Sequence, residues 1–345
     1  MKKLPVSRIN ELYAAISAEK SLYLPLEKAG QVNYGLWSDA ETVRLDELNT
    51  VRSAKDLFFP QTEHMMGFKM EGKTIEIIAP VPEDKDFVLM GVRACDARSF
   101  DVLDRVFLSE PVDTYYANRR AHGIVVTMAC HEPEETCFCT VFGVDPTNAG
   151  GDVTCWIAND TLYWNANTEK GEALTASLSA VLADADCADE KAVEEEKAAV
   201  SAILERLPLG KLNLEGFNGD ALTEKFNSPK WAELSRSCLA CGTCTFVCPT
   251  CQCYDIRDFD TGSGIQRYRC WDSCMYSDFT MMAHGNNRNS QMQRFRQRFM
   301  HKLVYFPANN DGMYSCVGCG RCVDKCPASL NIVKVIKAFS EKGDK

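Results

Sequence analysis

The sequence lacks the long apolar segments that would place it in or across a membrane. No run approaches the roughly 18 to 20 apolar residues of a spanning helix, and the first residues, Met1–Pro5, do not have the apolar character of a secretory signal. Positive charge is also scarce, because 48 acidic residues against 38 basic ones give a formal net charge of −10. We therefore expect a cytoplasmic protein that binds neither membrane nor nucleic acid.

Two signatures of nucleotide binding are missing as well. No G-x-G-x-x-G follows an expected strand, and no Walker loop is present. Such loops bring backbone N–H groups close to phosphates. Without them, the chain is not expected to hold a dinucleotide or a nucleoside triphosphate by itself.

Cysteine, by contrast, is abundant, with 18 residues in a chain of 345. Twelve of them lie between Cys238 and Cys326, and the others are spread over the first 187 residues. Because no export signal is expected and the spacing is that of metal ligands, we predict reduced, metal-binding thiols and not disulfides. So many liganding thiols also suggest an anaerobic setting, since exposed clusters and thiols are readily oxidised.

Two cysteine runs near the C-terminus have the spacing of bacterial-type [4Fe–4S] ligands, C-x2-C-x2-C-x3-C-P. In such paired runs, three thiolates bind one cluster and the fourth crosses over to the other. The first run is Cys238, Cys241, Cys244, Cys248 and Pro249, and the second is Cys316, Cys319, Cys322, Cys326 and Pro327. We predict one cluster held by Cys238, Cys241, Cys244 and Cys326, and a second held by Cys316, Cys319, Cys322 and Cys248.

The residues around these cysteines fit the same interpretation. Each proline ends a turn, and Gly242 and Gly320 are expected where the backbone passes close to inorganic sulfide without a Cβ. A zinc ribbon is the alternative, because it also uses C-x2-C pairs. Zinc needs only four ligands, however, and does not account for the third and fourth cysteine and the proline of each run.

A second set of four cysteines lies in the first half of the chain: Cys95, Cys130, Cys137 and Cys139. Cys95 and Cys130 each follow an expected strand, and neighbouring parallel strands would bring them to one edge of a sheet. These thiols could hold a third [4Fe–4S] cluster. Alternatively, Cys95 and Cys130 are small core residues, because unligated cysteine is often buried and C-x-C is not a standard cluster loop.

Four further cysteines lie between the two runs: Cys251, Cys253, Cys270 and Cys274. Cys270 and Cys274 are four residues apart, the spacing that places side chains on one helical face. These thiols could complete an additional metal site, with Cys251, Cys253 and Cys274 as candidates, or they could pack around the clusters. Cys155 and Cys187 are isolated and are expected to be structural.

A basic segment also separates the two runs, with no acidic residue from Phe279 to Asn310. Met292, Phe295, Phe299 and Leu303 predict the apolar stripe of a helix there. Cations and N–H donors beside anionic clusters would favour the reduced state and raise the potential. Docking of an acidic partner is the alternative. The basic residues are Arg288, Arg294, Arg296, Arg298, His301 and Lys302.

The patterns predict an α+β fold. Strands are expected at 74–78, 87–90, 124–128 and 160–166, with a helix over 97–107 that makes a strand–helix–strand unit. An amphipathic helix or helical pair is expected from about Ala173 to Leu207, ended by Pro208 and Gly210. We predict a mixed α/β domain over 1–170, a helical connection over 171–230, and a helical two-cluster ferredoxin-like domain over 231–345.

The motifs resemble those of one family, which comprises the iron–sulfur electron-transfer subunit of anaerobic sulfite reductase and the related β subunit of cytoplasmic sulfhydrogenase. The matching segments are Arg93–Asp96, Leu103–Phe107, Tyr115–Arg120, Cys137–Cys139, Cys238–Cys253, Arg267–Cys274 and Cys316–Cys322. They span about two-thirds of the chain in order. The sequence departs from the family at Cys270, where a non-cysteine residue is expected, and at Ala283–Asn286, where the family tends to have Gly-Gly-His.

The resemblance implies an electron-transfer subunit without an active site of its own. Its partners would be a flavin- and NAD(P)H-binding subunit and a terminal catalytic subunit, either sirohaem sulfite reductase or nickel–iron hydrogenase. It also implies a third cluster, because Cys95, Cys130, Cys137 and Cys139 fall on cysteine positions of the family. We expect a sulfite reductase subunit, with a hydrogenase β subunit as the first alternative. A stand-alone iron–sulfur enzyme or a structural iron–sulfur module is the second.

Overall fold

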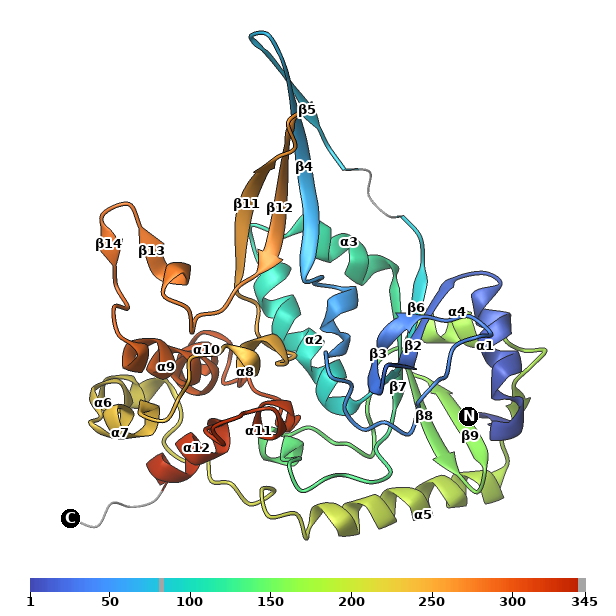
Figure 1. The fold of residues 1–345 in the computed structure, drawn as a ribbon. Helices are drawn as coiled ribbons and strands as arrows, with labels where there is room; N and C mark the ends of the chain where they lie inside the picture. Colours follow the sequence, from blue (N-terminus) through green and yellow to red (C-terminus); the bar gives the residue numbers. More distant parts are fainter. Residues whose placement is uncertain (81–83, 341–345) are drawn as a thin grey trace.

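The computed structural model describes residues 1–80 and 84–340 (Figure 1). The helices are α1 Ile9–Ser17, α2 Ala94–Phe107, α3 Thr114–His122, α4 Glu169–Ser177, α5 Cys187–Leu204, α6 Leu222–Asn227, α7 Lys230–Ser235, α8 Thr243–Phe246, α9 Gln291–Met300, α10 Phe306–Asn309, α11 Arg321–Asp324 and α12 Ile332–Ser340. The strands are β1 Lys2–Pro5, β2 Ser21–Lys28, β3 Gln31–Leu36, β4 Thr62–Glu71, β5 Thr74–Ile78, β6 Phe87–Val92, β7 Gly123–Met128, β8 Val153–Ala158, β9 Thr161–Ala166, β10 Ala183–Asp184, β11 Tyr254–Asp260, β12 Ile265–Trp271, β13 Met281–Met282 and β14 Gly285–Asn286. This mixture of helices and sheets confirms the α+β class.

An eight-stranded sheet forms the centre of the first half, in the order β10-β1-β9-β8-β7-β6-β2-β3. Its middle strands, β2, β6, β7 and β8, run parallel, and the outer strands are antiparallel. The predicted strands at 87–90, 124–128 and 160–166 are confirmed as β6, β7 and β9. The predicted helix between the first two is confirmed as α2.

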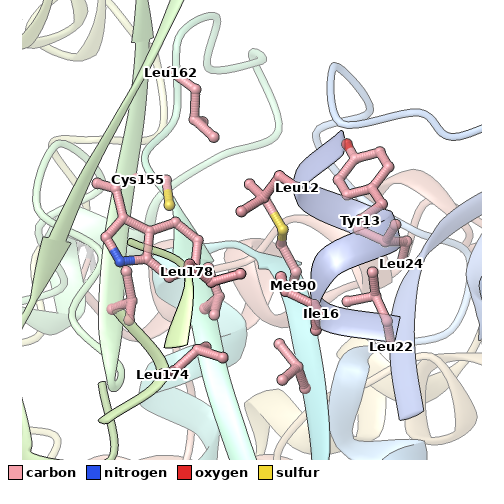
Figure 2. Packing of buried hydrophobic residues seen from close by; sticks show 14 of the residues in the cluster. Leu12, Tyr13, Ile16, Leu22, Leu24, Met90, Cys155, Leu162, Leu174 and Leu178 are labelled. Atoms are coloured by element: carbon pink, nitrogen blue, oxygen red, sulfur yellow. The ribbon is translucent and has the colours of Figure 1, made fainter. Parts of the chain in front are cut away.

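Both faces of this sheet are buried. Val88 and Met90 of β6 point into a core with α1 and α4 (Figure 2), whereas Leu89 and Val92 point into a second core with α2 and α3. Continuous burial of β6 and β7 explains why they are uniformly apolar, as is typical of parallel strands covered on both sides.

The predicted helical segment after the sheet is confirmed as a pair, α4 and α5. Val193 and Val200 are buried, and the glutamates at 194 and 195 are exposed. Helix α5 ends at Leu204, a few residues before the predicted end at Pro208. Since β10 joins the central sheet and Val193 packs against Trp156, this segment contacts the first half closely. The division at residues 170 and 230 stays a prediction.

A second sheet joins the two halves of the chain in a way that the sequence patterns did not predict. It has the order β11-β12-β4-β5 and extends away from the body as a long arm (Figure 1). The segment between the cysteine runs was expected to be helical, but it begins with the hairpin β11–β12, which pairs with β4. The predicted strand at 74–78 is present as β5, although it is an exposed edge strand and not part of a core.

The C-terminal helices pack around a third core. The predicted stripe is confirmed, because Phe295, Phe299 and Leu303 are buried together with Val335 and Ile336 of α12. Helix α9 continues into a π-helical turn at His301–Tyr305. Within residues 1–80 and 84–340, no helix has both the length and the apolar character that a membrane crossing requires.

Candidate iron–sulfur sites

The first candidate site is a small cavity lined by four cysteines: Cys238, Cys241, Cys244 and Cys326. Three come from the first run and one from the second, which is the crossover that the sequence predicts. Met275 and Leu330 complete the wall. The chain turns through Gly242 at a φ of +76°, a left-handed conformation that favours glycine, and helix α8 begins directly after it.

The second cavity has the reciprocal composition. It is similar in size to the first and is lined by Cys248, Cys316, Cys319 and Cys322. Gly320, at a φ of +79°, precedes α11 just as Gly242 precedes α8. A Cβ on Gly320 would approach the Thr136 carbonyl oxygen to 2.8 Å, so this glycine accommodates the loop from the first half of the chain. The sequence instead predicted that the backbone at this glycine would pass close to inorganic sulfide.

The third cavity, of similar size, lies between the two halves. It is lined by Cys95, Cys130, Cys137 and Cys139, so the structure brings together all four N-terminal cysteines. Cys95 lies at the start of α2 and Cys130 follows β7 by two residues. They therefore lie beyond the carboxyl ends of the neighbouring parallel strands β6 and β7, as predicted.

The second and third cavities share wall residues, and a hydrogen bond links the walls of the first and second. Gly318 and Cys319 line both the second and the third cavity. The Gly318 carbonyl accepts a hydrogen bond of 3.0 Å from the backbone N–H of Phe138, which lies between Cys137 and Cys139. Between the first and second cavities, the Arg298 guanidinium donates to the Cys244 carbonyl and lines the second cavity.

The cysteines are spread around these volumes instead of converging on one point. Among the residues that the structure describes, no three His, Cys, Asp or Glu side chains are close enough to hold a single metal ion. Three cavities of nearly equal size, lined by four, four and five cysteines, fit cuboidal clusters better than zinc ions. Ligation of iron by these twelve cysteines stays a prediction.

Burial makes the thiols of these cavities difficult to ionise without a metal. It raises the pKa of Cys137 and Cys244 to about 11 and the pKa of Cys139 and Cys316 to about 12. Cys241 differs, because a hydrogen bond from the Thr243 side chain lowers its pKa. The bound metal must therefore displace protons at most of these positions.

Two cations of the basic segment are buried beside the cysteines. The Lys302 ammonium donates to the Thr250 hydroxyl and the Ser315 carbonyl, at 2.7 and 2.9 Å. No carboxylate within the described residues pairs with Lys302 or Arg298, and two guanidinium nitrogens of Arg298 have no hydrogen-bond partner there. Desolvation opposes the charge on both side chains, but the nearby cysteines, when ionised, outweigh it and raise both pKa values.

These buried cations support one of the two roles weighed for the basic segment. Buried charge requires compensation. The cysteine-lined cavities supply negative charge when they hold clusters, since a [4Fe–4S] core with four thiolates carries about −2. Arg298 and Lys302 therefore fit a role in favouring cluster reduction. Arg296 faces the opposite way, because its guanidinium lies 3.5 Å over the ring of Phe226.

The sequence patterns missed an internal ion pair at the junction between the halves. Both oxygens of the Asp96 carboxylate accept hydrogen bonds of 2.7 Å from the Arg321 guanidinium, and both side chains are buried. Asp96 follows Cys95, and Arg321 precedes Cys322. The only signal in the sequence is a charged residue directly beside a cysteine in each motif.

Arg93 is a second buried cation that the patterns missed. It lines the third cavity and donates to the Ala129, Leu45 and Glu47 carbonyls, at 2.9, 2.5 and 2.9 Å. These contacts hold the loop that follows β7 against the loop at residues 45–47. Arg93 thereby fixes the segment that carries Cys130.

Comparison with known proteins supports the same assignment. The family model for the 4Fe-4S dicluster domain matches residues 237–330. The subunit called Sulfhydrogenase 2 subunit beta, from Pyrococcus furiosus, is 30% identical over 344 residues, covering 98% of both chains. The chain belongs to the sulfhydrogenase β-subunit family. No solved structure matches it.

Membership in the sulfhydrogenase β-subunit family makes this chain an iron–sulfur electron-transfer subunit with [4Fe–4S] clusters in its dicluster domain. As a β subunit it belongs to a multisubunit oxidoreductase.

The remaining cysteines of this family member lie outside the three cavities. Cys251 and Cys253 follow the first run, and Cys274 follows β12. Cys270 lies within β12, opposite Asp255 of β11. Because Cys270 is paired in a strand, it does not share a helical face with Cys274, as the spacing of the two residues suggested. Cys155 is buried in the first core, whereas Cys187 is exposed at the start of α5.

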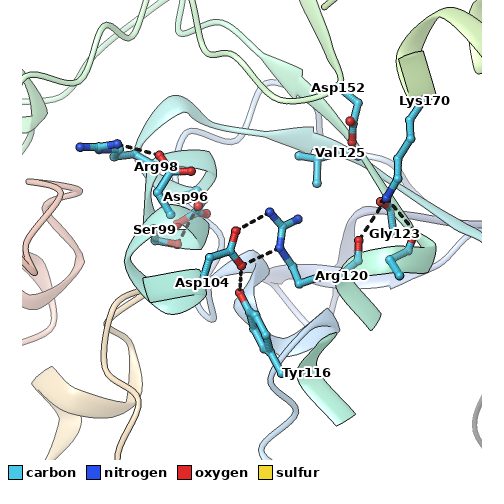
Figure 3. Close-up of polar contacts among 12 residues, drawn as sticks. Asp96, Arg98, Ser99, Asp104, Tyr116, Arg120, Gly123, Val125, Asp152 and Lys170 are labelled. Atoms are coloured by element: carbon cyan, nitrogen blue, oxygen red, sulfur yellow. Dashed lines mark hydrogen bonds and ion pairs between the residues drawn. The ribbon is translucent and has the colours of Figure 1, made fainter. Parts of the chain in front are cut away.

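A larger cavity, about 1700 Å³ and open to solvent, lies between α2, α3 and the segment 143–152. Charged side chains in its wall are already paired, as Figure 3 shows for Arg120 with Asp104 and for Lys170 with backbone carbonyls. The Tyr116 hydroxyl also donates to Asp104. Because these charges are satisfied internally, the cavity is a poorer candidate for a functional site than the three cysteine-lined ones.

Proposed function

We propose that this chain is the electron-conducting subunit of a hydrogenase complex. In this proposal, three [4Fe–4S] clusters link a flavin- and NAD(P)H-binding partner with a terminal nickel–iron subunit. The observation that carries the proposal is the set of three cavities, each lined by at least four cysteines, of which the second and third share part of their walls. A [4Fe–4S] cluster exchanges single electrons, so the series would divide a two-electron hydride step into one-electron steps.

The protein's own residues would hold and tune these centres. Cys319 belongs to the wall of two cavities and would give a short covalent route between them. Val317, Cys95 and Cys139 pack in one buried cluster, which keeps water out of the gap between the second and third sites. Arg298 and Lys302 would stabilise the additional electron at the second site.

The hydrogenase assignment rests on the relative. The relative that matches this chain over 98% of its length is called a sulfhydrogenase subunit. Its name favours the hydrogenase assignment over the sulfite reductase assignment that the motifs first suggested. The absence of nucleotide-binding loops in the sequence supports a separate flavin-bearing partner. The proposed location is the cytoplasm, because reduced thiols persist there.

The test is anaerobic purification of the complex that contains this chain, followed by metal analysis and electron paramagnetic resonance. We expect about twelve irons and twelve sulfides in this subunit, and cluster signals that appear under hydrogen. About eight irons would limit the count to two clusters. Signals that respond to sulfite and not to hydrogen would restore the sulfite reductase assignment. Centres that no low-potential reductant can reduce would indicate a structural module.

A further inference from the structure

The first cysteine-lined cavity has an exposed cysteine in its wall. This residue is Cys241, whereas the other eleven cysteines of the three cavities are buried or half-buried. Leu239, which lines the same cavity, is 67% exposed. Because electron tunnelling slows steeply with distance, a partner protein would exchange electrons most readily at this cavity.

Exposed apolar side chains continue from this cavity onto the hairpin β13–β14. Tyr276 is exposed, and its hydroxyl donates to the Cys241 carbonyl at 3.1 Å. Met281 and Met282 of β13 follow, and they are 59% and 49% exposed. We call Leu239, Tyr276, Met281 and Met282 the port surface.

Hydrogen bonds hold the parts of the port surface in place. Asn286 of β14 donates to the Ser277 carbonyl at 2.7 Å, which ties the hairpin β13–β14 to the residue after Tyr276. The Gln291 amide, at the start of α9, donates to the Cys238 carbonyl. The cysteine loop, the hairpin β13–β14 and α9 are therefore connected, and the port surface exists before a partner binds.

Positive charge borders the port surface on the side of α9. Arg294 donates to the Met275 and Arg288 carbonyls, at 3.1 and 2.9 Å, and these acceptors carry no net charge. The segment from Phe279 to Asn310 has no acidic residue, although Asp278 directly precedes it. Because the whole chain carries a net charge of −10, an acidic partner would be attracted to this border and repelled by most other surfaces.

The composition of the port surface and its border is typical of a protein interface. Tyrosine, methionine and arginine are enriched where proteins bind one another, and methionine adapts its shape to a partner. Figure 1 shows the hairpin β13–β14 extending from the body above α9, where a partner can reach it. The arm also exposes Met70 and Ile77, but no residue of 62–78 or 254–271 lines a cysteine cavity.

We propose that the port surface binds another subunit of the complex, one whose contact surface is apolar at its centre and acidic at its rim. Electrons would cross this interface one at a time, and no bond forms or breaks. Loss of one electron by the partner's centre accompanies reduction of a [4Fe–4S]²⁺ cluster in the first cavity to [4Fe–4S]⁺. The inference rests on the proposed function, because it needs a cluster in that cavity.

The experiment is site-specific photo-cross-linking within the purified, anaerobic complex that contains this chain. A photoreactive benzoylphenylalanine replaces Met281 in one sample and Met70, an equally exposed methionine of the arm, in a matched control. Peptide mass spectrometry identifies the cross-linked partners. We expect Met281 to yield cross-links to another subunit, at a segment flanked by Asp and Glu, and Met70 to yield none. The inference is wrong if Met281 yields no cross-link, if it reaches only a second copy of this chain, or if both positions reach the same subunit.

Charge reversal tests the acidic rim. The remaining subunits, produced without this chain, are titrated onto the immobilised, cluster-loaded full chain. Arg288→Glu should raise the dissociation constant about tenfold at low ionic strength and less at about 0.5 M salt. The control is Arg257→Glu, an exposed arginine of the arm, which should leave the constant unchanged. Equal effects of the two variants, or none from Arg288→Glu, would overturn an acidic partner.

Paramagnetic signals under hydrogen separate this inference from the proposed function. They are recorded on each cross-linking sample before irradiation. Failure of the proposed function gives centres that hydrogen does not reduce, whether or not cross-links form. Failure of the inference gives no cross-link from Met281 in a complex whose centres hydrogen still reduces.

Discussion

At the scale of single residues, buried positive charge lies beside the cysteines of the second cavity. Arg298 and Lys302 are buried without carboxylate partners in the described part of the chain. In a medium of low polarity, a cation several ångströms away still stabilises the reduced, more negative state of a cluster. The same burial holds protons on the thiols until metal replaces them.

Replacing Arg298 by Met should lower the reduction potential of the second cluster. One unit charge roughly 8 to 15 Å away, at an effective dielectric constant near 20, contributes about 1 to 2 kcal/mol, or roughly 50 to 90 mV for one electron. Redox titration followed by electron paramagnetic resonance measures this change. Arg296→Met, on the same helix but stacked on Phe226, is the control and should leave the potentials in place. Equal shifts in both variants would contradict a local effect.

Cluster assembly should depend on pH because the free thiols are protonated. With the pKa of Cys137 near 11 and that of Cys139 near 12, metal binding must release protons, and acid therefore opposes it. We expect iron uptake by the apoprotein to fall from about pH 9 to about pH 7. Visible absorbance during reconstitution reports the uptake. An uptake that rises as the pH falls would contradict these pKa directions.

At the scale of elements, short loops bring distant segments into contact. Helices α8 and α11 each begin after a left-handed glycine, and the loop before α11 packs against the segment that carries Cys137 and Cys139. The hairpin β11–β12 likewise attaches the middle of the C-terminal half to β4. These contacts place cysteines that are far apart in sequence around shared cavities.

Gly318→Ala should disturb the second and third sites together. Gly318 has a φ of +62°, and a Cβ there would overlap the Phe138 carbonyl and approach the Cys139 Cα to 2.6 Å. We expect destabilisation beyond the roughly 1 to 2 kcal/mol of left-handed strain alone. The control is Gly312→Ala, where φ is +80° but no atom lies within 4 Å, so only the strain applies. Thermal unfolding compares the two, and equal losses would show that the close approach is unimportant.

At the scale of the whole molecule, the third cavity joins the two halves. It combines four cysteines from the first half with Gly318 and Cys319 from the second, and the buried pair of Asp96 and Arg321 lies beside it. The junction is therefore both a structural contact and the expected route for electrons.

Asp96→Asn should destabilise the whole chain. It leaves the buried Arg321 guanidinium without its carboxylate, and breaking a buried pair in this way costs about 3 to 5 kcal/mol. Denaturant unfolding of the cluster-loaded protein measures the loss. Asp101→Asn, on the same helix but in a solvent-exposed pair with Arg98, should cost less than about 1 kcal/mol. Similar losses for the two variants would argue against a special role for the buried pair.

Cys137→Ala tests the third centre within the intact molecule. We expect the loss of about four irons, with the signals of the two ferredoxin-type clusters retained. Metal analysis together with electron paramagnetic resonance makes the comparison. Cys187→Ala removes an exposed thiol outside the cavities and should retain all the iron. An unchanged iron content in Cys137→Ala would show that the third cavity holds no cluster.

The sequence by itself determined the chemistry and much of the secondary structure. The spacing within each cysteine run limits how its thiols can surround a cluster, so the membership of the first two cavities, including the exchange of Cys248 and Cys326, could be predicted locally. Apolar periodicity was sufficient for β6, α2, β7 and the stripe of Phe295, Phe299 and Leu303, because burial of these elements imposes a repeating pattern.

Only the tertiary structure decided how the halves meet. The gathering of Cys95 and Cys130 with Cys137 and Cys139, the pairing of Asp96 with Arg321, and the hairpin β11–β12 depend on contacts between residues far apart in the chain. The hairpin has one exposed strand, β11, and many charged residues without a clear apolar alternation, so its sequence has no strong periodic signal.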